Sequence, residues 1–512
     1  MGCSSLKTLK LPANLTSISQ NMFANCSSLV EVEFGAGLTT IASGAFANCV
    51  SITKFEFTDN ITTIADGAFS GCAGLSELKL NANLKTIGAG AFKDCKLIKK
   101  IEIPAAVTYI GLGAFEGCNA VESITVPFVG GSATDTHFGY IFGAKTYEEN
   151  RTYVPYTLSD IIITGSTAFS AYAFSGCESI VSVSLPESLV AIADYAFEGC
   201  TSLTAVYCKS FEQWCAIDFA SYSANPLATA NELYINGVLA TEFIASAYGV
   251  TAIKPYTFYG AAEILTVDLT GVTSIGNDAF SHATALTTVK FDSAIDVIGA
   301  RAFVGCDSLE TVIIADVADW CGVVFADAFA NPLYYAGALY VGENAVTELT
   351  VSGVTAVSAY AFVNADFLTK VVIADGVETI GKSAFYGSNK IASLSIANTV
   401  TAISGSAFEK CSSIGTLSIG SAVDSIGVRA FADCVKLTKV IIPATVKTID
   451  AEAFSGCAAL VEVALNEGLV SIGTSAFAGC SALTTITIPA TVTVIGAHAF
   501  HGCDALDSSI LG

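Results

Sequence analysis

Apolar residues recur along the chain at a fixed spacing. Phenylalanine stands at every 23rd position from Phe23 to Phe115, and the same spacing returns from Phe362 to Phe500. The surrounding phrase is loosely constant, as in Ile-Gly-Ala-Gly-Ala-Phe-Lys-Asp-Cys at 87–95. A repeat of this length predicts a solenoid, in which each repeat is one unit of chain that buries its apolar side against its neighbours.

Each repeat also contains the pattern Leu-x-x-Val-x-Ile, seen in Leu437, Val440 and Ile442. Its alternation predicts one short strand per repeat, with the last two apolar residues on one face and the residue between them on the other. Proline often ends the strand, as at Pro443, because it removes a backbone donor. A run of the Val-Thr-x-Ile-Gly type follows, loosely kept at 446–449, and then the Ala-Phe segment, whose phenylalanine suits a stacked interior column.

These signatures resemble the leucine-rich repeat family, and the phrase Ile-Gly-x-x-Ala-Phe-x-Gly-Cys is similar to its BspA-like, or Treponema-type, class of 23-residue repeats. The resemblance covers nearly the whole chain. It implies a mainly β repeat solenoid, a leucine-rich-repeat arc with one short parallel strand per turn and turns or short second strands on the other side. It also implies a cell-surface or extracellular protein, because members of this class are often implicated in adhesion to matrix proteins or other cells.

The repeats are expected to form one domain over residues 1–512, with three interruptions. The phenylalanine spacing jumps to 59 between Phe115 and Phe174, to 61 between Phe197 and Phe258, and to 59 between Phe303 and Phe362. Such insertions map to loops on one side of a solenoid. We therefore expect regular repeats at 1–126, an insertion at 127–157, repeats at 158–207, a long repeat at 208–250, repeats at 251–314, a second long repeat at 315–345 and regular repeats at 346–512.

The two long repeats resemble each other and contain both tryptophans of the chain. Trp-Cys at 214–215 and Asn-Pro-Leu at 225–227 return at 320–321 and 331–333, and hairpin signals follow at Asn236-Gly237 and Gly342-Glu343-Asn344. Two interpretations are open: exposed aromatic contact patches, since such residues lead interface hot spots, or a hydrophobic plug that repacks the enlarged turn. The candidate patch residues, two of them from the first insertion, are Tyr140, Tyr147, Trp214, Trp320, Tyr334 and Tyr335.

Composition adds two facts, a high hydrophobic content and a strong negative charge. A content of 52% hydrophobic residues would suit a membrane protein in a chain without repeats. However, no window of about 18 uninterrupted apolar residues occurs, so a spanning helix is not expected. Lys and Arg number 23 against 46 Asp and Glu, which gives a formal net charge of −23. This excess argues against nucleic acid and anionic membrane surfaces as partners, because both need concentrated Lys and Arg, and it favours solubility of an apolar-rich array.

Fourteen of the 17 cysteines occupy one repeat position, three residues after the phenylalanine. Ala261, Ala283, Ala365 and Ser388 fill the same position elsewhere, so it behaves as a slot for any small side chain. We therefore expect buried thiols, which pack as small hydrophobic groups. Neighbours in such a column stand too far apart for unstrained disulfides, and neither a Cys-x-x-Cys pair nor a calcium-loop motif occurs, so no metal is expected.

The outward strand positions change character along the chain. Glu31, Lys54, Glu77 and Lys100 occupy one position in four successive repeats, which predicts a ladder of opposite charges across neighbouring strands. Later repeats carry hydroxyl groups there instead. This face, usually concave in leucine-rich repeats, is either a contact surface for a protein or glycan or a solvated β-surface. The candidate partner-binding residues on it are Ser393, Ser395, Thr416, Ser418, Thr485 and Thr487.

Catalysis finds little support. The equivalents of His498 and His501 vary freely among the repeats, and no Gly-x-Ser-x-Gly elbow, His-Glu-x-x-His helix or phosphate loop is present. A carboxylate pair for glycoside hydrolysis needs only three-dimensional spacing, so sequence does not test it. The favoured function is a non-catalytic, adhesin-like binding protein without a cofactor; the alternatives are an intracellular or periplasmic protein-protein scaffold and a glycan-binding accessory domain.

The chain starts and stops inside repeats, without the polar caps that exposed terminal repeats normally need. This pattern suggests a fragment, an excised array or an incomplete gene model. The start of the chain also lacks a secretory-signal pattern, but because it lies inside a repeat, that observation says little about location.

Overall fold

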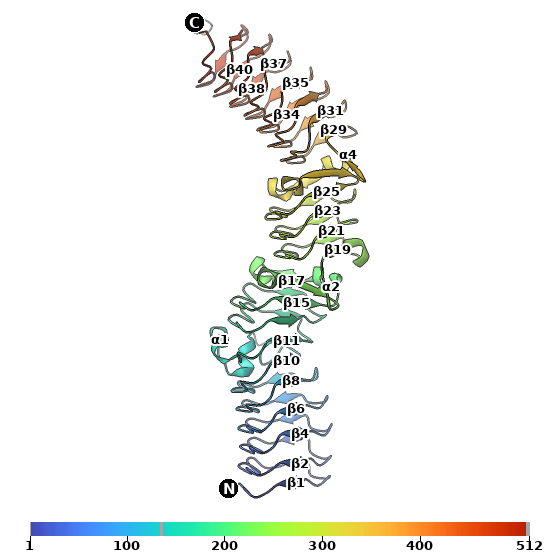
Figure 1. Ribbon diagram of the computed structural model, residues 1–512, viewed down its shortest axis with the longest axis vertical. Coiled ribbons are helices and arrows are strands. Elements are labelled where there is room, and N and C mark those ends of the chain that lie inside the picture. Colours follow the sequence, from blue (N-terminus) through green and yellow to red (C-terminus); the bar gives the residue numbers. More distant parts are fainter. Residues whose placement is uncertain (1, 134–136, 508–512) are drawn as a thin grey trace. The chain divides into compact units, whose positions relative to one another are not determined.

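The computed structural model describes residues 2–133 and 137–507. Within them the chain divides into two compact units (Figure 1). Unit 1 extends to Ala240 and includes Tyr256–Glu263, and unit 2 comprises Thr241–Pro255 and the chain from Ile264 onward. Each unit is a stack of short coils with mostly parallel strands and few helical residues, which confirms the predicted repeat solenoid. Three residues of the predicted insertion, 134–136, lie outside the described residues, and the single-domain expectation for 1–512 stays a prediction.

The first strand of each coil belongs to a column that we call the strand face. Its parallel strands pair in register, so that Lys54 lies opposite Glu77 and Phe55 opposite Leu78. In β4 and β6 the two end residues are exposed and the middle one is buried, as alternation predicts. In unit 1 the strands are Thr8–Lys10 (β1), Glu31–Glu33 (β2), Lys54–Glu56 (β4), Glu77–Lys79 (β6), Lys100–Glu102 (β8), Ser123–Val126 (β10), Asp160–Ile163 (β11), Ser182–Ser184 (β13), Ala205–Cys208 (β15), Glu232–Ile235 (β17) and the hairpin strand Val238–Leu239 (β18).

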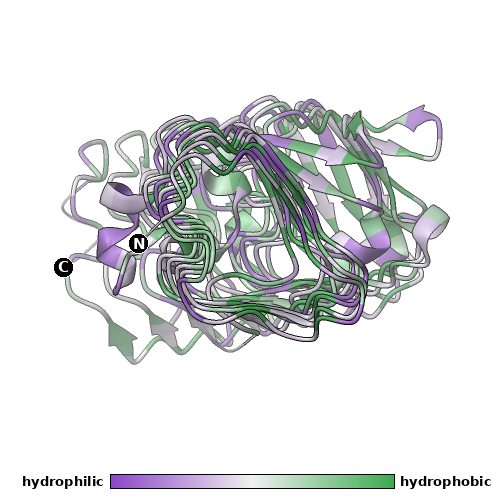
Figure 2. Ribbon diagram, turned by 90° about the horizontal axis from the view of Figure 1, so that it is seen from below, coloured by the Kyte–Doolittle hydropathy of each residue, from purple (hydrophilic) through white to green (hydrophobic). Residues whose placement is uncertain are grey.

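The strand face of unit 2 follows the same plan. Its strands are Glu242–Ile244 (β19), Thr266–Asp268 (β21), Thr288–Lys290 (β23), Thr311–Ile314 (β25), Ala338–Val341 (β27), the hairpin strand Asn344–Ala345 (β28), Glu348–Val351 (β29), Lys370–Ile373 (β31), Ser393–Ile396 (β33), Thr416–Ser418 (β35), Lys439–Ile441 (β37), Glu462–Ala464 (β39) and Thr485–Ile486 (β41). Figure 2, which looks along the stack, shows hydrophilic and hydrophobic segments mixed within the coils.

A second column of two-residue strands lies on the other side of the coils, as the sequence pattern predicts. Each ends in a buried apolar residue, except for the last one. In unit 1 these strands are Thr40–Ile41 (β3), Thr63–Ile64 (β5), Thr86–Ile87 (β7), Tyr109–Ile110 (β9), Ala168–Phe169 (β12), Ala191–Ile192 (β14) and Asp218–Phe219 (β16). In unit 2 they are Ala252–Ile253 (β20), Ser274–Ile275 (β22), Val297–Ile298 (β24), Val324–Phe325 (β26), Ala356–Val357 (β30), Thr379–Ile380 (β32), Ala402–Ile403 (β34), Ser425–Ile426 (β36), Thr448–Ile449 (β38), Ser471–Ile472 (β40) and Val494–Ile495 (β42).

The hydrogen-bonded ladder of the strand face is interrupted at defined places. In unit 1 it stops between β6 and β8, and in unit 2 it stops after β28 and again between β35 and β37. The hairpin strands β18 and β28 pair antiparallel with β17 and β27, at the two turns that the sequence predicts. The breaks at β6–β8 and β35–β37 have no hairpin and lie among regular repeats.

The phenylalanine column fills the interior of the coils. The rings of Phe431 and Phe454 are completely buried and stack with centroids 5.3 Å apart and planes at 8°. The backbone next to the rings is equally regular, because the N–H of Phe431 donates to the carbonyl oxygen of Ala453 in the next coil at 2.8 Å. Similar pairs follow along both units, so the predicted stacked column is confirmed.

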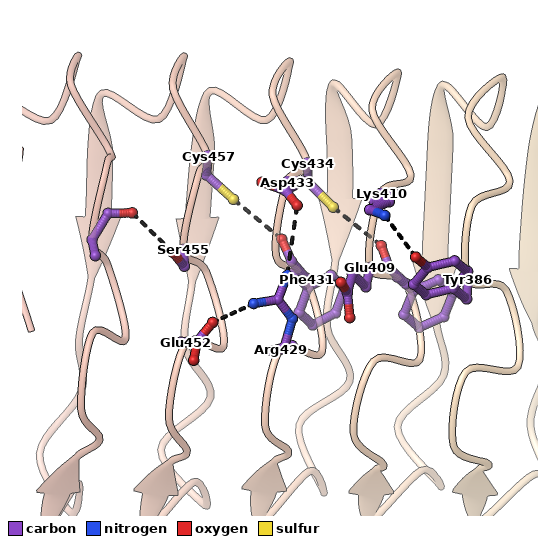
Figure 3. A network of polar contacts seen from close by, with 12 residues as sticks. Tyr386, Glu409, Lys410, Arg429, Phe431, Asp433, Cys434, Glu452, Ser455 and Cys457 are labelled. Carbon is purple, nitrogen blue, oxygen red and sulfur yellow. Dashed lines mark hydrogen bonds and ion pairs between the residues drawn. The ribbon is translucent and has the colours of Figure 1, made fainter.

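The cysteine column beside it forms hydrogen bonds between coils (Figure 3). The Sγ atom of Cys457 lies 3.3 Å from the carbonyl oxygen of Phe431, and Ser388 keeps the same bond with its Oγ 2.8 Å from the carbonyl oxygen of Phe362. All 17 cysteines are free and all except Cys3 are buried. The predicted buried thiols are therefore confirmed except at Cys3, and at most coils the slot holds a small side chain that can donate a hydrogen bond.

Each long repeat replaces the phenylalanine turn with a short helix and a buried polar clamp. In the second one, Nε1 of Trp320 in Val317–Gly322 (α4) donates to the carbonyl oxygen of Ala361 at 2.8 Å. The Nδ2 atom of Asn331 reaches the same oxygen at 2.9 Å and that of Tyr360 at 2.8 Å. In a regular coil the equivalent carbonyl accepts the N–H of the preceding phenylalanine. Side chains thus take over a bond that the backbone makes elsewhere.

The first long repeat has the same clamp. Trp214 in Phe211–Ala216 (α2) and Asn225 both donate to the carbonyl oxygen of Thr257, at 2.9 Å and 3.2 Å. The two indoles are 0% and 2% exposed, so neither Trp214 nor Trp320 can contact a partner, and the candidate aromatic patches lose them. Their burial follows from the clamp, because the indole N–H is needed inside the coil. Both side chains belong to a plug of the kind that the second interpretation describes.

The first insertion uses asparagine in a related way. Asn150 is fully buried; its Oδ1 accepts from the N–H of Gly139, and its Nδ2 donates to the carbonyl oxygen of Ser175, each at 3.0 Å. Phe138 meanwhile continues the aromatic column, 5.4 Å from Phe174. The remaining helices and 3₁₀ turns are Phe138–Phe142 (η1), Tyr147–Glu149 (η2), Asn150–Tyr153 (α1), Tyr222–Ala224 (η3), Leu227–Ala230 (α3), Ala245–Tyr248 (η4), Ala328–Ala330 (η5) and Pro332–Tyr334 (η6).

Candidate functional site

The outward side chains of β29 to β39 form two rows on the strand face of unit 2. The first row is charged at both ends, with ion pairs between Lys370 and Glu348 at 3.1 Å and between Lys439 and Glu462 at 2.8 Å. The second, which we call the uncharged row, contains no ionisable side chain. Strand register and the 23-residue spacing place in it Thr350, Val372, Ser395, Ser418, Ile441 and Ala464.

A groove of about 480 Å³ opens on this face where the ladder between β35 and β37 stops. One wall carries Thr416, Leu417 and Ser418, and the opposite wall carries Lys439 and Ile441. Ile441 is 57% exposed, so the outward face carries an accessible large aliphatic side chain at this point. The groove therefore combines hydroxyl groups with accessible apolar surface, and we call it the β35–β37 groove.

The structure brings four of the six predicted strand-face residues together. Ser393 lies opposite Thr416 and Ser395 opposite Ser418, so these hydroxyl groups form a compact square on β33 and β35. Thr485 and Thr487 are exposed but lie beyond β37 and β39, which carry Lys439 and Glu462 between them and the square. The groove residues Leu417 and Ile441 were not predicted; the only sequence signal is an aliphatic residue, Ile441, at an outward position.

The strand face of unit 1 is different, because its strands β2, β4, β6 and β8 carry charges in both rows. The register confirms that Lys54 stands in line with Glu77. Glu77 and Glu31 also act on Lys54 as favourable opposite charges, as the predicted cross-strand ladder requires. The direct ion pairs of this column nevertheless lie within strands: Lys54 bonds Glu56 at 3.1 Å and Lys100 bonds Glu102 at 2.6 Å. Residues two apart on one face of a strand are close enough for long side chains to meet. The hydrogen bond to Glu56 is the largest cause of the raised pKa of Lys54.

None of the candidate tyrosines lines the β35–β37 groove. Tyr334 and Tyr335 are half-buried and touch each other, with ring centroids 5.0 Å apart. Tyr140 is half-buried and lies 6.0 Å from His137. The rings of Tyr147, Tyr172 and Tyr195 stack in one row, with planes 11° apart at each step. The last two were missed in the sequence, although they stand 23 residues apart, two positions before Phe174 and Phe197.

The polar clusters of the coils form structural ion pairs. Arg429 joins Glu409 at 2.8 Å and also contacts Glu452 and Asp433 (Figure 3). Burial by itself would raise the pKa of Glu409, but hydrogen bonds from Arg429 and Ser406 outweigh it and lower the pKa. His498 and His501 are exposed turn residues. Among residues 2–133 and 137–507, no group of three or more His, Cys, Asp or Glu side chains is arranged to hold a metal ion.

The buried thiols are poor nucleophiles. Burial raises the pKa of Cys72 to about 12 and that of Cys49 to about 11. The reactive form of cysteine is the thiolate, which needs a lowered pKa and access to solvent. At neutral pH these two side chains are therefore protonated, and their chemistry is confined to packing and the hydrogen bond described above.

Comparison with known protein families identifies the repeats. The model of the BspA type leucine rich repeat region, which describes six copies of the repeat, matches residues 1–126, 150–227, 237–330, 343–459 and 424–511. These matches cover most of the chain and leave out parts of the first insertion and of both long repeats. No curated protein matches the chain by sequence.

Three similar solved structures come from bacteria. A leucine-rich repeat protein of Bacteroides ovatus is 18% identical, with 96% of this chain and 92% of that chain covered and a TM-score of 0.26. The leucine-rich repeat protein of Treponema pallidum is 29% identical over 34% of this chain and 82% of its own, with a TM-score of 0.32. A leucine-rich cell surface protein of Faecalibacterium prausnitzii is 18% identical over 76% and 88%, with a TM-score of 0.24.

Proposed function

Because the chain belongs to the BspA-type leucine-rich repeat family, we propose that it is a non-catalytic binding protein of the cell surface or extracellular space. In this proposal the strand face of unit 2 contacts a partner protein, and no cofactor takes part. Repeat solenoids commonly use such extended faces for binding. The family assignment alone does not name a partner, so the choice of face rests on the side chains of this chain.

The observation that carries the proposal is the uncharged row beside the β35–β37 groove. Strands β2, β4, β6 and β8 of unit 1 carry charges in both outward rows, whereas this row has no ionisable side chain from Thr350 to Ala464, in a chain whose formal net charge is −23. The central part of a protein interface is typically depleted of charge and rich in groups that can be desolvated at low cost. Hydroxyl groups and aliphatic side chains meet both requirements.

A fourfold lysine variant tests the strand-face assignment. Thr416, Ser418, Thr485 and Thr487 are replaced by lysine, and binding to a panel of purified extracellular-matrix proteins and to a glycan array is compared with wild type. The four sites are exposed, so folding should survive, and any binding seen for wild type should fall or change its target. The matched control places four lysines at Thr379, Thr401, Ser481 and Thr493, which are exposed outside the strand face. Equal binding by both variants and wild type would remove the strand face from the proposal.

Location is tested separately. Among the described residues, none of the helices has the length and apolar character needed to cross a bilayer. Antibody labelling of intact and permeabilised source cells distinguishes the surface proposal from an internal scaffold. Labelling of intact cells is the expected result, and labelling only after permeabilisation would contradict it.

A further inference from the structure

Leu417 is a core residue that the structure leaves uncovered. It occupies the inward position of β35, where the neighbouring Leu394, Val440 and Val463 are 1%, 1% and 3% exposed. Leu417 is only half-buried, as is Ile419 two residues later. Leu417 lies beside the point where the ladder between β35 and β37 stops.

Four aliphatic groups gather in the β35–β37 groove. Leu417 and Ile419 lie on one wall, and Ile441 and Pro443 lie on the other. The hydroxyl groups of Thr416 and Ser418 belong to the same lining, and Lys439 is neutralised by its ion pair with Glu462. A volume of about 480 Å³ is within the range of sites that bind compact ligands. An apolar floor without net charge disfavours a charged occupant, because desolvating a charge there is costly.

The lining also distinguishes between a glycan and a peptide. It contains no Trp, Tyr or Phe side chain, whereas aromatic rings are the side chains that pair an apolar face with a polar group for amphipathic ligands. On the β37 side, the main chain of β35 has no ladder partner among the described residues. A protein segment in extended conformation can supply an apolar side chain to this floor and main-chain hydrogen bonds to the hydroxyl groups of Thr416 and Ser418.

We propose that the β35–β37 groove binds an extended, uncharged segment of a partner protein and holds one of its large apolar side chains against Leu417 and Ile441. This inference rests on the proposed function and adds the anchor that the partner must provide. A buried apolar anchor surrounded by hydroxyl groups corresponds to the usual anatomy of an interface hot spot. The same arrangement is missing at the β6–β8 break, where Leu78 is 8% exposed and the outward neighbours Glu77 and Lys79 are charged.

The test uses the full chain with labelled Ile and Leu methyl groups. Methyl NMR spectra are recorded with the capped pentapeptide Thr-Thr-Leu-Thr-Thr and with versions in which Phe, Ala or Asp replaces the central Leu. We expect the Leu and Phe peptides to shift the methyl signals of Leu417 and Ile441, and the Ala and Asp peptides to leave them in place. Chitotriose serves as the glycan probe and should leave them in place as well.

Two variants locate the effect. Ile441→Ser should weaken binding of the Leu peptide roughly tenfold, whereas Ala464→Ser, the equivalent position one repeat later, should change it less than about twofold. Both positions are outward, so both variants should fold, and unchanged far-UV circular dichroism checks this. Equal shifts with all peptides, larger shifts with chitotriose, or no shift at Leu417 and Ile441 would overturn the anchor. If the groove fails while the fourfold lysine variant still loses its partner, the strand-face proposal survives without the anchor.

Discussion

The regular coils and the long repeats solve the same hydrogen-bonding problem with different groups. In a regular coil, the carbonyl oxygen before each phenylalanine accepts the backbone N–H of the previous phenylalanine, as Ala453 does from Phe431. After a long repeat, the equivalent oxygen of Ala361 accepts from Trp320 and Asn331 side chains instead. A buried carbonyl must find a partner in either case. The comparison shows that the solenoid tolerates an irregular turn where side chains replace the missing backbone donors.

The largest effect should come from the aromatic column of the regular coils. Phe454→Ala removes a fully buried ring that stacks on Phe431 and Phe477, so the free energy of unfolding should fall by about 3 to 5 kcal/mol. Urea titration followed by far-UV circular dichroism measures it. The control is Phe329→Ala in the long repeat, where the ring is 40% exposed and the loss should stay below about 1.5 kcal/mol. Equal losses of unfolding free energy in Phe454→Ala and Phe329→Ala would contradict the distinction between the aromatic column and the long repeat.

The clamp of the long repeat should be next in size. Asn331→Ala leaves the carbonyl oxygen of Tyr360 and the N–H of Leu333 without their side-chain partner, while Ala361 keeps Trp320. The bond to Tyr360 is part-buried, so we take roughly 1 to 1.5 kcal/mol for each of the two groups, the lower part of the range for a group left unsatisfied, and expect a loss of about 2 to 3 kcal/mol in the same titration. Asn344→Ala on the exposed hairpin is the matched control and should change stability by less than about 0.5 kcal/mol. A neutral Asn331→Ala would show that the clamp is dispensable.

The thiol column should give the smallest effect. Cys457→Ala removes the donor to Phe431 but leaves that carbonyl its bond from the N–H of Cys434, so we expect a loss of about 1 kcal/mol. Cys457→Ser should lose less, because Ser388 already makes the bond in another coil. Thermal unfolding of the two variants side by side ranks them. If Cys457→Ala is more stable than Cys457→Ser, the position requires only a small side chain and not a hydrogen-bond donor.

Sequence pattern is sufficient for the regular coils because their contacts repeat at a fixed spacing. The stacked phenylalanines and the alternating strand residues follow from local periodicity, and the hairpin at Asn236-Gly237 follows from its turn residues. The Trp320 bond could not be predicted, since its acceptor lies 41 residues further along the chain. The break at β35–β37 could not be predicted either: Thr416–Ser418 and Lys439–Ile441 fit the same pattern as strands that do pair. Local sequence rules predict which residues of a strand are buried, but they do not predict whether the strand pairs with the next one.

The asparagine clamp also bears on how such a chain can change its length over generations. Asn150, Asn225 and Asn331 each meet the hydrogen-bonding needs of the next coil within one insertion. A duplicated or deleted segment that carries its own clamp therefore leaves the coils on either side chemically unchanged. Insertions of this kind can be gained, lost or moved as whole modules, because no compensating substitutions are required elsewhere in the array.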